Sequence, residues 1–274
     1  MNEGAFKKYG KRTLIYAFLI LMSLISVFPL YWCFISSFNT TSEILGGKMI
    51  PGSHLMENLR NLFDQQDVLN AFKNSVINTA LVLVLSLAIC SIAGYGFEIF
   101  HDKGKDAVMA VLMMSMMVPF VAILVPLFQM FTKLGFVNKY IGFILPSLST
   151  PFLIMLFRNN ARNFPREVLE AARVDGLSEV GIFTRMFFPM MRPTYAAAAT
   201  ITFMNTWNAY LWPKVVLQTA DSTTMPMLVA NLRSGYVIDY GVVMSGVTIC
   251  TLPTVIVFFF LQKSFTEAVA GAVK

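Results

Sequence analysis

Six long stretches without a charged residue limit what this chain of 274 residues can fold into. Each is between 18 and 30 residues long, and a helix needs roughly 20 residues to cross the hydrocarbon core of a bilayer. A soluble protein has no need for six such runs, and only 13% of this chain is charged, against about 25% in soluble domains. We therefore predict an all-α, polytopic membrane protein with six transmembrane helices in one domain, residues 1–274. The expected spans are residues 13–37, 72–98, 107–131, 140–157, 193–213 and 240–262.

The distribution of Lys and Arg predicts the orientation of these spans, because basic residues concentrate in cytoplasmic loops. With the N-terminus in the cytoplasm, most of the 21 Lys and Arg residues fall in cytoplasmic segments, notably in the loop of residues 158–192. Six spans then return the C-terminus to the cytoplasm. The net charge of +6 is accordingly a topology signal and not a nucleic-acid surface. We expect a multi-pass protein of a bacterial plasma membrane, surrounded by lipid, whose first apolar run is too long for a cleaved signal peptide.

Several classes of function are disfavoured by what the apolar runs contain. Cys33, Cys90 and Cys250 lie inside them without metal-ligand spacing, and His54 and His101 lie in different loops, so no metal site is predicted. Paired acids and the His-Glu-x-x-His and Gly-x-Ser-x-Gly motifs are missing from the spans, so we predict no catalytic residues. Coupling to ions normally requires acids within the membrane, which argues against a secondary transporter.

Prolines and small residues indicate where helices bend or approach one another. Pro119 and Pro126 predict a broken helix around residues 119–126, and such breaks are tolerated in a membrane only where protein or a water-filled cavity satisfies the backbone. Broken segments often line transport pathways. Pro29 should kink or end the first span. Gly94 and Gly96 would allow a neighbouring helix to come close.

The polar loop after the fourth run has the features of an ordered helix. Pro165 can occupy its first turn, and Glu170 lies early enough to suit the helix dipole. Ala171 and Ala172 give a narrow surface that fits a groove, and Gly176 can end the helix. Helical order in a loop indicates that something docks on it, although a lipid-facing loop whose arginines only fix the topology remains an alternative.

This loop resembles the cytoplasmic signature loop of binding-protein-dependent ABC importer permeases, which has Glu-Ala-Ala, three residues, Gly, and then a spaced Phe and Pro. In that family the loop forms a coupling helix that sits in a cleft of the ATPase subunit. The resemblance implies that residues 165–185 couple this chain to an ATPase. The residues that match the motif are Glu170, Ala171, Ala172, Asp175, Gly176, Phe183 and Pro189.

Further matches narrow the resemblance to the carbohydrate-uptake class, and within it to the smaller permease of a maltose-type transporter. They are Phe164-Pro165, Trp207-Asn208, Trp212-Pro213 and Gly271 to Lys274. The resemblance implies the type I importer permease fold and a pore shared with a second, larger permease subunit. It also implies an extracytoplasmic sugar-binding protein and two ATPase subunits that bind ATP and Mg. No phosphate-binding loop occurs in this chain, so no cofactor is expected in it.

Two further sites follow from this comparison. The ending Gly271, Ala272, Val273 and Lys274 is similar to a tail that reaches into the ATPase dimer interface, the alternative being a solvated tail.

For the substrate pathway, the best local cluster of polar and aromatic residues is Asn205, Trp207, Asn208 and Tyr210, because polar residues inside a membrane tend to face cavities. The Trp-Asn pair recurs across the family whatever the sugar, so a structural role is the alternative. Glycerol phosphate or a polyol remains the alternative substrate, and the larger permease is the alternative holder of most sugar contacts.

Overall fold

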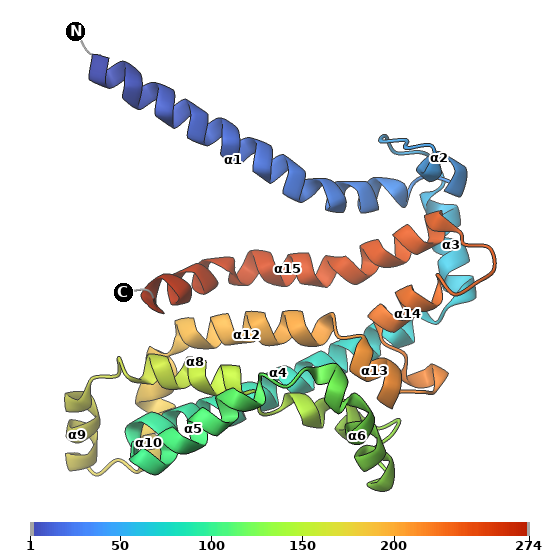
Figure 1. Ribbon diagram of the computed structural model, residues 1–274. Coiled ribbons are helices and arrows are strands. Elements are labelled where there is room, and N and C mark those ends of the chain that lie inside the picture. The colour runs from blue at the N-terminus through green and yellow to red at the C-terminus, as the bar shows by residue number, and fades with distance from the viewer. Residues whose placement is uncertain (1–2, 273–274) are drawn as a thin grey trace. The chain divides into compact units, whose positions relative to one another are not determined.

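The computed structural model describes residues 3–272, and the side chains of residues 11–260 and of Gln262. Every regular element in this part of the chain is helical (Figure 1), as predicted. The longer helices are α1 (Glu3–Ser36), α3 (Leu55–Gln65), α4 (Val68–Ile99), α5 (Lys103–Ser115), α6 (Phe120–Lys133), α8 (Pro151–Ala161), α9 (Arg166–Val174), α12 (Arg192–Trp207) and α15 (Tyr240–Ala272). The shorter ones are α2 (Thr41–Leu45), α7 (Tyr140–Ile144), η1 (Leu145–Ser147), α10 (Glu179–Ile182), η2 (Phe183–Phe187), α11 (Phe188–Met190), α13 (Leu211–Val216), η3 (Ala220–Ser222) and α14 (Met225–Asn231).

Three helical segments are long and apolar enough to cross a membrane: Lys11–Ser36, Val68–Ile99 and Tyr240–Phe260. Two bent pairs raise the number to five if each pair is one span. These are α5 with α6, bent by 99°, and the Tyr140–Ser147 segment with α8, bent by 47°. The remaining expected span corresponds to α12, which has 16 residues and is shorter than the roughly 20 that a bilayer core requires. The count of six therefore stays a prediction.

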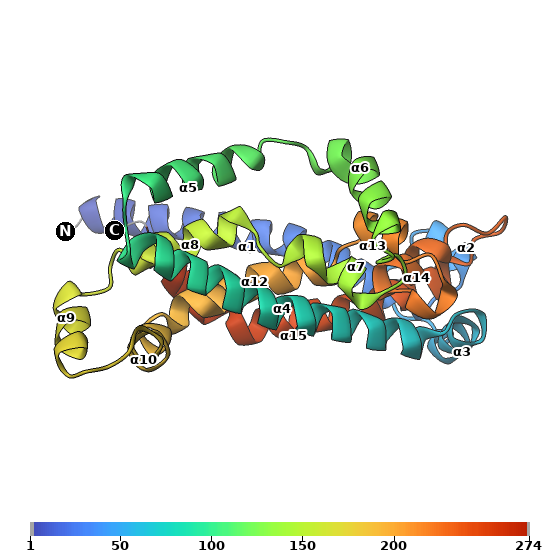
Figure 2. The ribbon, with the colours of Figure 1, turned by 90° about the horizontal axis from the view of Figure 1, so that it is seen from below.

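The third expected span is broken next to a proline. Residues 116–119 separate α5 from α6 (Figure 2), and Pro119 precedes α6 with an extended backbone. Proline disfavours helical geometry in the residue before it, which ends a helix at this point. The break lies ahead of Pro119 and not beyond it, since Pro126 lies inside α6. The first span does not end at Pro29, because α1 continues to Ser36.

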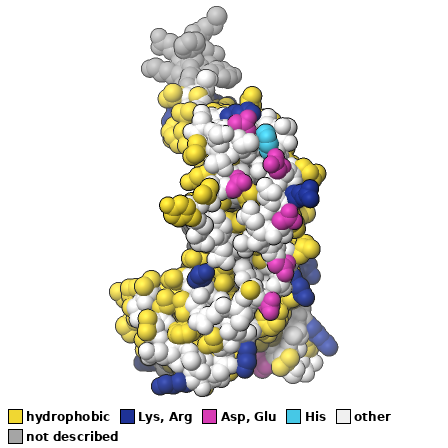
Figure 3. All heavy atoms as spheres, turned by 90° about the vertical axis from the view of Figure 1, so that its right-hand side faces the viewer, with side chains coloured by type: hydrophobic (Ala, Val, Ile, Leu, Met, Phe, Trp, Pro, Cys, Tyr) yellow, Lys and Arg dark blue, Asp and Glu magenta, His cyan; other side chains and the backbone are white. Residues whose placement is uncertain are grey.

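The chain divides into two compact units, and the first contains residues up to Asp67 together with Val229–Thr251. Asn58 of α3 is buried in this unit, and its Nδ2 donates to the carbonyl oxygens of Ser37 at 2.9 Å and Asn39 at 3.0 Å. A Cβ atom on Gly241 would lie 2.6 Å from Oδ1 of Asn58, so the start of α15 packs directly on this amide. Charged side chains of both signs are scattered over the face that holds α2 and α3 (Figure 3).

The second unit contains residues Val68–Leu228 and the chain from Leu252 onward. Its most extensive helix–helix packing joins α4 to α8. The two helices come close at Gly94, where a Cβ atom would lie 2.5 Å from Cβ of Phe157. The close approach expected at Gly94 is therefore present. A Cβ atom on Gly96 would meet nothing within 4 Å, so the same expectation is wrong for Gly96, which faces away from that neighbour.

Candidate functional site

Helix α9 begins and ends where its local sequence predicts. Pro165 precedes its first residue with an extended backbone, and Gly176 follows it with φ +81°. The amide of Gly176 donates to the carbonyl of Arg173 at 3.1 Å, and that of Leu177 to the carbonyl of Ala172 at 3.0 Å. Space does not require glycine here, because a Cβ atom would meet nothing within 4 Å. Glycine is needed for its positive φ, a conformation that residues with a side chain rarely adopt.

The residues that match the signature motif fall on two faces of this segment. Glu170, Ala171, Asp175 and Gly176 are exposed, so they form a surface that a partner can reach. Ala172 is buried in the chain's own core together with Leu169 and Phe187, and Phe183 and Pro189 are half-buried. The first group is available for docking, whereas Ala172 and Phe183 pack in the apolar cluster that joins α9 to the helices after it.

A chain of polar contacts joins α9 to α4. Arg173 Nε donates to Oε1 of Glu179 at 2.8 Å, and Tyr95 OH donates to Oε2 of the same carboxylate at 3.3 Å. The bond to Glu179 raises the pKa of Arg173. The Tyr95 ring also lies edge-on to Phe183 and Phe187, with centroids 5.3 and 4.9 Å apart. The carboxylate of Glu179 therefore links Arg173 of α9 to Tyr95 of α4.

Charged side chains also tie α8 to α4 and α5. Arg158, whose side chain is 6% exposed, pairs with Glu98 at 3.2 Å and with Asp106. Glu98 accepts a second pair from Arg162 at 3.3 Å, and His101 Nε2 lies 2.9 Å from Asp106. Sequence reasoning missed this network, although an acid at the end of an apolar run was a signal, since such a charge needs a partner.

A cavity of about 490 Å³, called the central cavity below, lies in the second unit among α4, the α5–α6 break, the α7–α8 segment and α12. Phe120 and Trp212 give it aromatic walls, and Thr202, Asn205 and Thr206 add polar groups. None of the described residues that line it is charged. The break in the third expected span thus borders a cavity, which is where broken membrane helices are tolerated.

One of the four predicted pathway residues lines this cavity. Asn205 does, whereas Trp207 is buried and stacks on Phe203 at 5.7 Å. Asn208 donates through Nδ2 to the carbonyl of Met204 at 2.8 Å, and Tyr210 is exposed outside the cavity lining. These contacts favour the structural role of the Trp-Asn pair.

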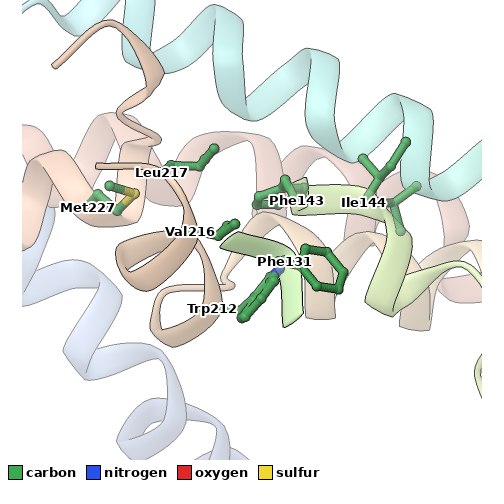
Figure 4. Close-up of a cluster of buried hydrophobic side chains, with 8 residues drawn as sticks. Phe131, Phe143, Ile144, Trp212, Val216, Leu217 and Met227 are labelled. Atoms are coloured by element: carbon green, nitrogen blue, oxygen red, sulfur yellow. The ribbon is translucent and has the colours of Figure 1, made fainter. Parts of the chain in front are cut away.

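Thr202, Thr206 and Trp212 are among the lining residues that the sequence did not predict. Thr202 and Thr206 lie on α12 with Asn205, and the buried Oγ1 of Thr202 makes no hydrogen bond with a described residue. Trp212 belongs to a cluster of buried apolar side chains (Figure 4) and lies edge-on to Phe131, with centroids 5.2 Å apart. Its Nε1 donates to the carbonyl of Gly142 at 3.0 Å, which fixes the indole as a rigid wall.

The predicted tail lies at the limit of the described structure. Gly271 and Ala272 are the last residues of α15, and Val273 and Lys274 lie outside the described residues.

Comparisons with known proteins agree on the kind of protein that this fold represents. Residues 92–271 match the family described as "Binding-protein-dependent transport system inner membrane component". The chain is 43% identical to the lactose transport system permease protein LacG of Rhizobium radiobacter, over 94% of this chain and 95% of the relative. It is 34% identical to the arabinooligosaccharides transport system permease protein AraQ of Halalkalibacterium halodurans, over 92% and 93% of the two chains.

The fold is shared with a chain of a solved structure, the crystal structure of a bacterial ABC transporter involved in the import of the acidic polysaccharide alginate. The TM-score is 0.83 at 18% identity, covering 97% of this chain and 99% of that one. By its family match and its relatives, this chain belongs to the binding-protein-dependent transport system inner membrane components.

Proposed function

We propose that this chain is a permease subunit of an ATP-driven sugar importer and forms a pore with a second, larger permease. The observation that carries the proposal is the 43% identity to a permease named for lactose transport over nearly the full length of both chains. The central cavity supports it, because its lining combines aromatic surfaces with hydroxyl and amide groups, as small-molecule sites that read polar solutes do.

The orientation that fits this role places both termini in the cytoplasm of a bacterial cell. The C-terminal end of α4, the ion-pair network and α9 then lie on the cytoplasmic side, where ATPase subunits are found. The N-terminal end of α4 lies on the outer side, where a sugar-binding protein delivers its solute. The exposed apolar side chains of α1, such as Leu14, Phe18 and Leu24, face lipid or the partner permease.

In this mechanism the exposed face of α9 docks on an ATPase subunit, and the tail from Gly271 to Lys274 makes a second contact. ATP and Mg are bound by those partners. Their closure displaces α9, and the contact of Arg173 and Tyr95 with the Glu179 carboxylate carries the displacement to α4. Since α4 lines the central cavity through Val82, its movement changes access to the cavity from one side to the other.

The alternative substrates differ in charge. A permease for glycerol phosphate would need a cation to compensate the phosphate, because an unpaired charge in a low-dielectric site is costly. The uncharged lining of the central cavity therefore favours a neutral sugar or polyol. The relatives named for lactose and arabinooligosaccharides favour a sugar.

The test is association and uptake in the reconstituted transporter. Glu170→Lys places a cation on the exposed face of α9, and we expect it to abolish co-purification with the ATPase and uptake of labelled lactose. Glu57→Lys makes the same change on the exposed surface of α3 and should leave both intact. Failure of the wild type to associate with an ATPase, or normal uptake by Glu170→Lys, would contradict the proposal.

A further inference from the structure

A second cavity of about 330 Å³ lies near the N-terminal end of α4, apart from the central cavity. Residues of α4, of the turn 138–140 and of the loop 217–222 line it. None of these residues also lines the central cavity. The apolar cluster of Figure 4 contributes Trp212 to one lining and Leu217 to the other.

The loop wall of this cavity is fastened to α4 by side-chain hydrogen bonds. Asn74 Nδ2 donates to the carbonyl oxygens of Asp221 at 2.7 Å and Thr223 at 2.9 Å. The amide of Met225 donates to Oγ of Ser75 at 2.8 Å. The loop therefore has a defined position before any ligand arrives, which lowers the entropic cost of binding.

The turn wall is held to the same loop by one asparagine. Asn138 has φ 58°, and its Oδ1 accepts from the amides of Gln218 at 2.5 Å and Thr219 at 3.3 Å. The backbone N–H of Asn138 donates to the carbonyl oxygen of Val216 at 2.9 Å. Asparagine is among the few residues that tolerate this left-handed backbone, and its side chain here joins the two walls.

One buried amide oxygen in the lining lacks a hydrogen-bond donor among the described residues. Asn78 lies one helical turn after Asn74 on α4, lines the cavity and is 2% exposed. Its Oδ1 accepts no hydrogen bond from a described residue. A buried acceptor without a donor is costly. A ligand hydroxyl that donates to Oδ1 removes this cost, which favours binding.

The charges of the lining indicate a neutral ligand. Lys139 and Asp221 are the charged residues among those described in the lining, so the lining has no net formal charge and an anion would meet a carboxylate. Thr219, Ser222 and Tyr140 add hydroxyl groups, which both donate and accept. The volume is at the lower end of the roughly 300–1,000 Å³ range of small-molecule sites.

We propose that this cavity is a carbohydrate subsite, separate from the central cavity, in which Asn78 Oδ1 accepts a hydrogen bond from a solute hydroxyl. The proposal rests on the sugar-import function and on the orientation given above. The subsite then lies on the outer side, where a solute released by the binding protein reaches this chain before it enters the central cavity.

Protection of an introduced cysteine tests this subsite in the complete transporter, reconstituted in nanodiscs. Ser222→Cys places a thiol in the lining, and Ala220→Cys places one in the same turn but outside the lining. At a lactose concentration about twice the dissociation constant, one third of the sites stay free, so maleimide labelling at position 222 should slow about threefold. Labelling at position 220 should not change.

A second substitution links the protection to the unpaired amide. Asn78→Leu has nearly the same volume and removes the acceptor, so protection of Ser222→Cys should disappear. The labelling rate without sugar should stay the same, which shows that the loop is still in place. Asn78→Leu should also raise the lactose concentration that half-saturates uptake.

The outcomes separate this subsite from the proposed function. Lactose uptake by the wild type without protection at position 222, or protection that survives Asn78→Leu, overturns the subsite and leaves the function standing. Protection by sn-glycerol 3-phosphate but not by lactose or an arabinooligosaccharide overturns the neutral ligand. Absence of uptake for both sugars overturns the proposed function, whatever the labelling shows.

Discussion

The two ends of α4 are held in place by different chemistry. At the N-terminal end, the neutral amide of Asn74 bonds main-chain oxygens. At the C-terminal end, Glu98 pairs with Arg158, and Tyr95 donates to the carboxylate of Glu179. Neutral hydrogen bonds define a shape without a strong field, which suits an uncharged solute. Partly buried ion pairs are strong and hold their two side chains in one geometry. Such contacts suit a connection between helices that transmits movement.

The largest expected effect comes from the charged end. Arg158→Ala leaves Glu98 and Asp106 without their most buried partner, and breaking a buried pair costs about 3–5 kcal/mol. We expect a large fall in the thermal unfolding midpoint of the protein in nanodiscs. Arg162→Ala is the control, because Arg162 is 57% exposed and exposed pairs contribute about 0–1 kcal/mol. Equal unfolding midpoints for the two variants would show that the pairs of Arg158 do not hold α8 to α4 and α5.

The contact between α4 and α8 at this end gives the next effect. Gly94→Ala would place Cβ 2.5 Å from Cβ of Phe157 and 2.8 Å from the amide nitrogen of Arg158, and overpacking of this kind costs about 1–3 kcal/mol. Gly96→Ala has open space and should not destabilise the protein. The unfolding midpoints of the two variants measure the difference, and a shift of the same size in both would refute the close approach.

At the neutral end, Asn74→Leu removes the donor to the carbonyl oxygen of Thr223 in a partly buried hydrogen bond, and its loss costs at most the roughly 1–3 kcal/mol of a fully buried acceptor left without a donor. We expect faster hydrogen–deuterium exchange in the loop 217–224, by a factor that does not depend on salt because no charge is involved. Asn70→Leu removes a more exposed donor to the same loop and should have a smaller effect. If the increase in exchange rate depended on salt, the contacts at the N-terminal end of α4 would not be neutral, and the contrast with the charged C-terminal end would be wrong.

The smallest effect concerns the Tyr95 hydroxyl. Tyr95→Phe keeps the ring contacts with Phe183 and Phe187 and loses the bond to Glu179, which is long at 3.3 Å and is worth about 1.5 kcal/mol, the lower end for a hydrogen bond to a charged group. Stability should fall slightly, while lactose uptake per ATP hydrolysed should fall more clearly. Glu179→Gln weakens the contacts with both Tyr95 and Arg173, so its effect on this ratio should be larger. Unchanged ratios in both variants would exclude this route from α9 to α4.

The sequence was sufficient where local rules determine the structure. The bounds of α9 follow from Pro165 and Gly176, because the constraints on their φ angles act within a single turn of chain. The break before α6 follows from Pro119 for the same reason. The all-α fold follows from the charge-free runs, since a membrane interior admits helices whose backbone is satisfied internally.

The sequence was insufficient where helices must be paired or rotated. Asn205 and Trp207 are two residues apart on α12, and a helix turns by about 200° over that distance, so one lines the cavity and the other is buried. The polar character of the cluster was visible, but its rotation about the helix axis was not. Packing of the neighbouring helices decides that rotation.

By itself, the amino-acid sequence determined that this chain is helical, that it belongs in a membrane, and that an ordered helix carrying Glu170, Ala171 and Ala172 follows the fourth apolar run. The tertiary structure alone decided that Arg158 meets Glu98, that Tyr95 and Arg173 share one carboxylate, and that Asn78 lines a cavity with residues about 140 positions away. The reason is physical: caps, prolines and glycines act over a few residues, whereas ion pairs and cavities arise when distant helices pack, and that packing is not encoded in any single segment.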